Sequence, residues 1–106
     1  MKDLTMTVLP VVCTLTPAAL KARRAGLLSG LLRRAEAQEE VPDGYRLRFT
    51  PTEGLLSHIA EAIDAERQCC RFLRFIVTVE PDEGSVFLEL SGPAGTREFL
   101  SALLDV

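Results

Sequence analysis

Two adjacent thiols and a carboxylate lie close together in the chain, at Cys69, Cys70 and Glu66. Thiolates bind soft metal ions, and a reactive thiol can also attack an electrophile. A carboxylate one helical turn before the thiols could act as a further ligand or as a base. Cys13 would join this group if the segment that carries it lies beside the other two cysteines.

The first interpretation is a binding site for a soft metal, built from Cys69, Cys70, Glu66 and Cys13. Its spacing is not that of a standard zinc site, because the two cysteines are adjacent and no second pair follows. The single histidine, His58, lies about 16 Å before Cys69 along a helix that rises 1.5 Å per residue. It therefore cannot join Cys69 from the same helix.

The second interpretation is a thiol redox or nucleophilic enzyme with Glu66 as the base. Both thiols lie at the C-terminal end of an expected helix, where the helix dipole disfavours a thiolate. Arg67, Arg71 or Arg24 would have to outweigh that effect. No cysteine–histidine pair is recognisable, so the sequence leans away from an enzyme and leaves the catalytic residues unknown.

The third interpretation is structural, and it rests on the position of Glu66 within an apolar helix face. At 100° per residue, the helix expected over about 53–71 gathers one apolar arc from Leu55, Ile59, Ala62, Ile63, Cys70 and Leu73. Glu66 falls in the middle of this arc. A buried carboxylate without a partner costs on the order of several kcal/mol, so Glu66 needs a counter-charge.

The expected counter-charge is Arg24, which falls inside the apolar stripe of an earlier helix over 17–38. The alternative partners are Arg34, Arg46 and Arg48. In this interpretation Arg24 and Glu66 form a structural ion pair, and the cysteines are small buried hydrophobic residues.

The elements that position these residues follow from the periodicity of apolar side chains. The expected order is β-α-β-α-β-β-α. It comprises short extended pieces over 4–8 and 11–15, a helix over 17–38, a turn over 39–44, a strand over 45–49, a helix over about 53–71 capped by Thr50 or Thr52, strands over 73–80 and 85–91, and a last helix to about 104. The whole chain, 1–106, is expected to form one domain.

The last two strands are expected to form a hairpin around the loop 81–84. This register pairs Val79 with Val86, Val77 with Leu88, and Phe75 with Leu90. Each strand has one apolar face and one mostly polar face, which favours helices on one side of a sheet. The fold class is therefore a two-layer α+β sandwich, with three helices on one face of a small, mostly antiparallel sheet.

The other face of the sheet is expected to carry Ile76 and Phe87 on neighbouring strands. Two apolar side chains there could seed a homodimer. A homodimeric interaction module without chemistry is thus the alternative from another functional class, with the cysteines and the Arg24–Glu66 pair as structural features.

The composition is that of an ordinary globular domain, with 106 residues, 47% of them hydrophobic and 25% charged. The net charge of −3 gives no attraction to nucleic acid or to an anionic membrane. No apolar run approaches the ~18 residues of a membrane span, and the start lacks the pattern of a signal peptide. Three cysteines do not suggest a disulfide framework, so we expect a cytoplasmic protein with reduced thiols.

Four motifs of the chain are Cys13-Thr-Leu-Thr-Pro, Asp43-Gly-Tyr-Arg-Leu-Arg-Phe, Glu66-Arg-Gln-Cys-Cys-Arg-Phe-Leu and Ser91-Gly-Pro-Ala-Gly. Together they resemble a group of small bacterial proteins of no known activity, in which a Glu-Arg-x-Cys-Cys-Pro-Phe motif recurs. The resemblance implies no catalytic or ligand residues. Arg71 departs from the motif, where proline is expected, and adds a cation beside Cys70.

The leading hypothesis is a thiol-based binding domain for a soft metal or a thiol-reactive ligand. The predicted site is Cys69, Cys70 and Glu66, with Cys13 within reach. No cofactor other than a soft, thiophilic metal ion is suggested.

Overall fold

The computed structural model describes residues 27–104. Within this range the side chains of residues 27–29, 69, 103 and 104 are not described. The elements in chain order are helix α2 (Leu27–Arg34), strand β1 (Ala37–Val41), strand β2 (Gly44–Phe49), helix α3 (Leu55–Cys69), strand β3 (Arg74–Val79), strand β4 (Val86–Ser91) and helix α4 (Thr96–Leu104). The expected strands over 4–8 and 11–15 and the start of the first helix, with Cys13 and Arg24, lie outside the described residues.

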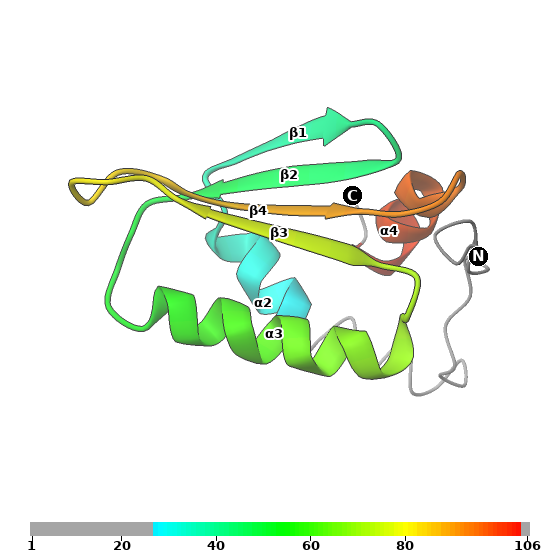
Figure 1. Cartoon of the computed structure of the whole chain (residues 1–106), viewed down its shortest axis with the longest axis horizontal. Coiled ribbons are helices and arrows are strands. Elements are labelled where there is room, and N and C mark those ends of the chain that lie inside the picture. Colours follow the sequence, from blue (N-terminus) through cyan, green and yellow to red (C-terminus); the bar gives the residue numbers. More distant parts are fainter. Residues whose placement is uncertain (1–26, 105–106) are drawn as a thin grey trace, which may run out of the picture.

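The strands form one sheet in the order β1-β2-β4-β3, and each neighbouring pair is antiparallel. Helices α2 and α3 cover one face of this sheet, and α4 lies at its end on the same side (Figure 1). Helix α3 connects β2 to β3 across the intervening β4. The predicted two-layer α+β sandwich, with three helices and an antiparallel sheet, is confirmed.

The hairpin of β3 and β4 has the register predicted from the sequence. Its pairs include Val79 with Val86, Val77 with Leu88 and Phe75 with Leu90. The N–H of Glu80 donates to the carbonyl of Ser85 at 3.1 Å, which closes the loop 81–84. Alternating apolar residues and a proline-containing turn are therefore enough to set this register.

The predicted boundary between a helix and a turn is wrong in this part of the chain, where the sequence predicted a helix over 17–38 and a turn over 39–44. Helix α2 ends at Arg34, and Ala37–Val41 is the edge strand β1, which leaves only 42–43 as the turn. The N–H of Glu36 already donates to the carbonyl of Arg48 at 2.8 Å. Across the strands, Glu36 pairs with Arg48 at 3.2 Å and Glu39 with Arg46 at 3.9 Å. Cross-strand partners thus override the helix propensity of this glutamate-rich segment.

The start of α3 also differs from the expectation. The residue before the helix is Gly54, at φ 82°, and no side chain caps the first turn. The hydroxyl of Thr52 instead accepts a hydrogen bond from Arg34 at 2.8 Å. Neither Thr50 nor Thr52 is therefore the cap, because Gly54 takes the left-handed conformation that starts the helix later.

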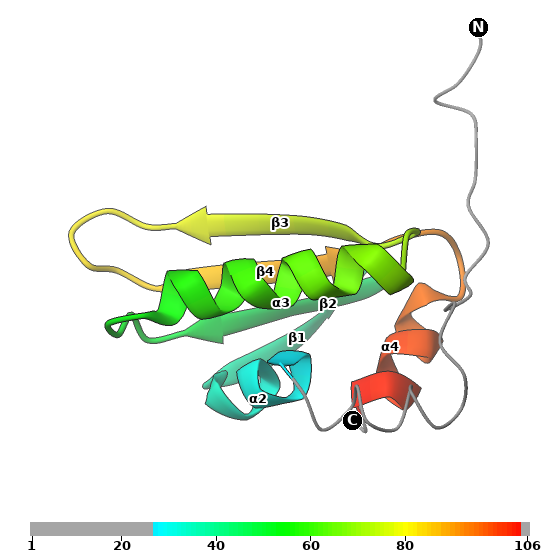
Figure 2. The same cartoon turned by 90° about the horizontal axis from the view of Figure 1, so that it is seen from below.

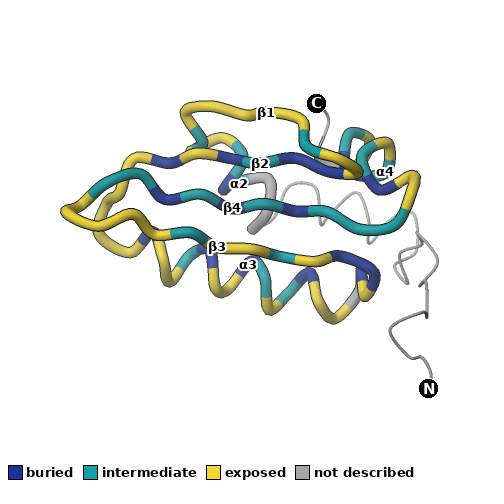
Figure 3. The backbone as a smooth tube through the Cα atoms, turned by 45° about the horizontal axis from the view of Figure 1, so that its top comes forward, coloured by how far each residue is buried: buried dark blue, intermediate teal, exposed yellow. Residues whose placement is uncertain are grey.

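The core lies between the sheet and α3, where the tube is dark blue in Figure 3. The buried apolar side chains are Leu31, Tyr45, Leu47, Phe49, Leu55, Ile59, Ala62, Cys70, Phe72, Leu73, Val86, Leu88, Leu90 and Leu100. The hydroxyl of Tyr45 forms a hydrogen bond with that of Ser101 on α4. The rings of Phe72 and Phe99 meet edge to face with centroids 5.1 Å apart. Helix α4 is thereby fixed against the sheet.

Strand β3 lies at one edge of the sheet, and the helices leave its inner face partly open. Phe75 is half-buried, but Val77 is 40% and Val79 55% exposed. Seen from the helix side, α3 crosses over β4 and leaves β3 to one side (Figure 2). The alternation in the sequence therefore predicts which residues share a face, but not that this face is uncovered.

Gly30 tests the packing of α2 on α3. A Cβ at this position would lie 3.8 Å from Cε1 and 3.9 Å from Nε2 of the His58 ring, which is ordinary contact. Because alanine is about 1 kcal/mol better than glycine inside a helix, we expect Gly30→Ala to stabilise the protein by about 0.5–1 kcal/mol. Thermal unfolding should show a rise in Tm of several degrees.

The control for Gly30→Ala is Gly54→Ala. No atom lies within 4 Å of a Cβ at Gly54, but the φ of 82° is strained for alanine. We expect Gly54→Ala to destabilise the protein by about 1 kcal/mol. A fall in Tm for Gly30→Ala would show that the contact between the helices is too tight for a methyl group.

Candidate functional site

Helix α3 buries one continuous stripe that includes a carboxylate. The stripe runs through Leu55, Ile59, Ala62, Glu66 and Cys70, each at most 2% exposed. The predicted position of Glu66 inside the apolar face is therefore confirmed. Because burying a carboxylate is costly, its presence among apolar neighbours makes this end of the helix a candidate functional site.

The backbone places Cys70 one turn after Glu66. The N–H of Cys70 donates to the carbonyl of Glu66 at 2.8 Å and closes the last helical turn. Cys70 then leaves the helical conformation at φ −116° and ψ 75°, and its own carbonyl accepts from the N–H of Leu73 at 3.2 Å. This tight reversal turns the chain directly into β3. It keeps the thiol of Cys70, which is in no disulfide, in the core on the same side as Glu66.

A shallow depression of about 230 Å³ opens at this end of α3, lined by Arg67, Cys70, Arg71 and Leu73. Arg67 and Arg71 are exposed, whereas Cys70 is buried. The two arginines therefore border the depression with positive charge, and the buried thiol of Cys70 contributes to its wall.

The three alternative partners proposed for Glu66 make their contacts elsewhere. Arg34 forms a hydrogen bond with Nδ1 of His58 at 2.8 Å. Arg46 and Arg48 pair with glutamates of the β1 side, as described above. Arg24 lies outside the described residues, so the Arg24–Glu66 pair stays a prediction.

The soft-metal site is likewise a prediction. In the part of the chain that the structure describes, no group of three or more histidine, cysteine, aspartate or glutamate residues could hold a metal ion. Cys13 and the side chain of Cys69, two of the four predicted ligands, lie outside that description. The structure brings Glu66 and Cys70 together on one buried stripe and leaves the other two residues untested.

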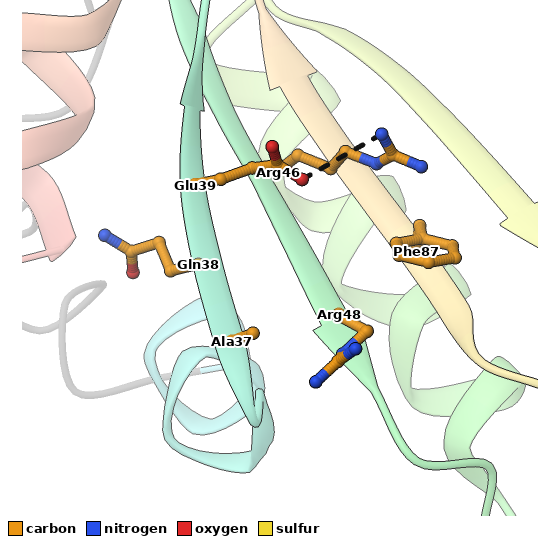
Figure 4. A pocket seen from close by; sticks show the side chains of 6 residues that line it. All are labelled: Ala37, Gln38, Glu39, Arg46, Arg48 and Phe87. Atoms are coloured by element: carbon orange, nitrogen blue, oxygen red, sulfur yellow. Dashed lines mark ion pairs between the residues drawn. The ribbon is translucent and has the colours of Figure 1, made fainter.

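A second depression, of about 210 Å³, lies on the sheet face away from the helices, which sequence reasoning missed. It is lined by Ala37, Gln38, Glu39, Arg46, Arg48 and Phe87 (Figure 4). The guanidinium carbon of Arg46 lies 4.3 Å from the centre of the Phe87 ring, a cation–π contact. The sequence signal for it was the alternation of Arg46 and Arg48 in one strand, together with Phe87 on the same face of another strand.

The charges of this second depression largely cancel. Arg46 pairs with Glu39 and Arg48 with Glu36, so each guanidinium already has a carboxylate. An incoming anion would have to compete with both glutamates. The end of α3 is the better candidate, because Arg67 and Arg71 border a buried thiol there.

Two further findings bear on function. Among residues 27–104, no helix combines the length and apolar character needed to cross a membrane. Comparison with models of known protein families, with curated proteins and with solved structures gives no match for this chain.

Proposed function

We propose that the protein is a thiol-based binding domain whose site is the C-terminal end of α3. Cys69 and Cys70 would supply the thiols, Glu66 would be the carboxylate beside them, and Cys13 would be a further thiol within reach. The observation that carries the proposal is the burial of Glu66 and Cys70, each 1% exposed and one turn apart, with Cys70 lining a depression. Thiols select soft metals and thiol-reactive compounds, which are the two ligand classes that fit.

The charges at the entrance favour a ligand that carries negative charge. The C-terminus of α3 contributes about −0.5 of a charge, whereas Arg67 and Arg71 contribute a full positive charge each. With a full negative charge counted for Glu66 as well, the sum is still about +0.5, so a bare metal cation is repelled and an anion is attracted. A soft metal would therefore arrive as an anionic thiolate complex, and a thiol-reactive compound would carry an acid group.

Access to Cys70 requires a local opening of the chain, because the thiol is buried. The last turn of a helix and a short reversal are segments that open at low cost relative to global unfolding. Binding should therefore be slow compared with an exposed thiol and should not require global unfolding.

The charge preference can be measured with two organomercurial probes, p-mercuribenzoate and phenylmercury, of which only the first carries a carboxylate. Each is supplied with a chloride or hydroxide on mercury. A thiol replaces this ligand, so a sulfur–mercury bond forms, the mercury–ligand bond breaks, and the thiol proton leaves with the released chloride or hydroxide. We expect the cationic entrance to raise the rate ratio of the anionic probe to the uncharged one by about threefold to tenfold at low salt. Stopped-flow absorbance on the reduced protein gives both rates.

Arg67→Gln and Arg71→Gln together should remove this preference, and salt above about 0.1 M should weaken it in the native protein. Cys70→Ser should remove the slow phase of the reaction and identify the buried thiol. Equal rate ratios for the native protein and the double glutamine variant would refute the charge preference.

A homodimeric interaction module is the second candidate function. The sequence placed Ile76 and Phe87 in the contact face. Ile76 is 42% exposed, but Phe87 is half-buried beneath the guanidinium of Arg46. The observation that favours association is thus the exposure of β3, where Ile76 lies on one face and Val77 and Val79 on the other.

A further inference from the structure

The two edges of the sheet differ sharply in chemistry. Strand β1 carries Glu39 and Glu40 on its exposed surface, which discourages pairing with another strand. Strand β3 carries one charged residue, Arg74, and its exposed apolar side chains are Ile76, Val77 and Val79. An exposed apolar edge of this kind is a template for a further strand.

The hydrogen bonds show which backbone groups of β3 face outward. The N–H of Glu80 donates across the hairpin to Ser85, so residues of even number in this strand point their backbone groups at β4. The N–H and C=O groups of Phe75, Val77 and Val79 therefore point away from β4. Among residues 27–104, no strand pairs with this side of β3.

We propose that β3 pairs with β3 of a second copy of the chain, antiparallel, around a two-fold axis at Val77. This contact would join two four-stranded sheets into one continuous sheet. The proposal deepens the second candidate function, and it does not depend on the thiol site.

Charge complementarity selects the register of this contact. In the register centred on Val77, the cross-strand pairs are Val77 with Val77, Phe75 with Val79, Ile76 with Thr78, and Arg74 with Glu80 of the other copy. Arg74 and Glu80 are both exposed in the single chain. The two-fold axis forms this pair of opposite charges twice, once at each end of the contact. The two side chains stand at a narrow pair of the ladder, where cross-strand side chains come closest.

The backbone supports the same register. The N–H and C=O groups of Phe75, Val77 and Val79 would each bond to the opposite residue of the other copy. These three residue pairs form two hydrogen bonds each, which makes six. A shift that centres the contact on Ile76 would need the N–H of Leu73, which already donates to Cys70. A shift to Thr78 would place Phe75 opposite Pro81, which has no N–H to donate.

The test exchanges the two charges on the full chain and measures the dimer dissociation constant by analytical ultracentrifugation. Arg74→Glu alone places like charges opposite each other twice, so we expect a dimer about tenfold or more weaker. Glu80→Arg alone should have the same effect. The double variant Arg74→Glu with Glu80→Arg should restore the native dissociation constant, because the pair is rebuilt with reversed polarity.

A second variant tests the backbone bonds. Val77→Pro removes an N–H that points outward and takes no bond away from β4, so the fold should survive at this edge. Circular dichroism checks the fold, and the dimer should be lost. A native chain that stays monomeric up to about 1 mM would overturn the proposal. So would a dimer whose dissociation constant is unchanged in Arg74→Glu and in Val77→Pro.

Discussion

Gly44→Ala is expected to unfold the protein or to destabilise it by more than about 3 kcal/mol. A Cβ at Gly44 would lie 1.9 Å from the carbonyl oxygen of Leu90 and 2.8 Å from the Cα of Ser91. Both atoms belong to the backbone of β4, which cannot rotate away as a side chain can. The two central strands would have to separate at this end of the sheet, where Gly44 pairs with Ser91.

Urea denaturation measures this effect, and total stabilities of about 5–15 kcal/mol make such a loss severe. The matched control is Gly30→Ala, which adds the same methyl group at a helix position where it would make only ordinary contacts. A Gly44→Ala protein that unfolds within about 0.5 kcal/mol of the native protein would contradict the close approach of β2 and β4.

Glu66→Gln is expected to destabilise the protein by about 3–5 kcal/mol if Glu66 is paired with a buried cation. The two side chains have nearly the same shape, so the loss would come from the missing charge. Glu66 is 1% exposed, which removes the screening that makes surface pairs weak. Chemical denaturation of the reduced protein gives the free energy of unfolding.

A double-mutant cycle identifies the partner of Glu66. Arg24→Leu alone should cost about as much as Glu66→Leu alone, because each leaves a buried charge behind. The two changes together should cost less than either one, since no buried charge remains. Costs that simply add would show that Arg24 is not the partner.

The elements α3, β3 and β4 could be predicted from the sequence because the patterns that determine them lie within each element or in the short turn between two of them. The apolar spacing of α3 locates Glu66 on the buried face, and the turn after Glu80 sets the hairpin register. The segment 37–41 could not be predicted in this way. Its residues favour a helix, and the outcome depends on Arg46 and Arg48, which become neighbours only after β2 has paired with it.

The buried residues of the candidate site could be predicted from the sequence, but the depression around them could not. A helical wheel is sufficient to place Glu66 and Cys70 together, and both are buried. The depression bordered by Arg67 and Arg71 depends on the reversal at Cys70, a backbone detail that no periodicity encodes. The open edge of β3 likewise depends on the strand order, which places β4 between β2 and β3.

The close approach at Gly44 shows the same limit. Its neighbour Leu90 is far away in the sequence, and only the pairing of β2 with β4 brings the two backbones together. A glycine at the start of a predicted strand looks like part of a turn, as 39–44 did here. Its role in strand packing becomes visible only in three dimensions.

The thiol-binding function is tested most directly by elemental analysis with thiol counting on protein purified without oxygen. The protein is incubated with a soft metal, supplied as its anionic glutathione complex, and then separated from the free complex. We expect about one metal per chain and fewer reactive thiols than in the same protein before metal is added. Cys70→Ser should retain no metal, and its thiol count should not change when metal is added. No retained metal, with all three thiols still counted, would contradict a metal-binding role and favour cysteines that serve only as packing in the core.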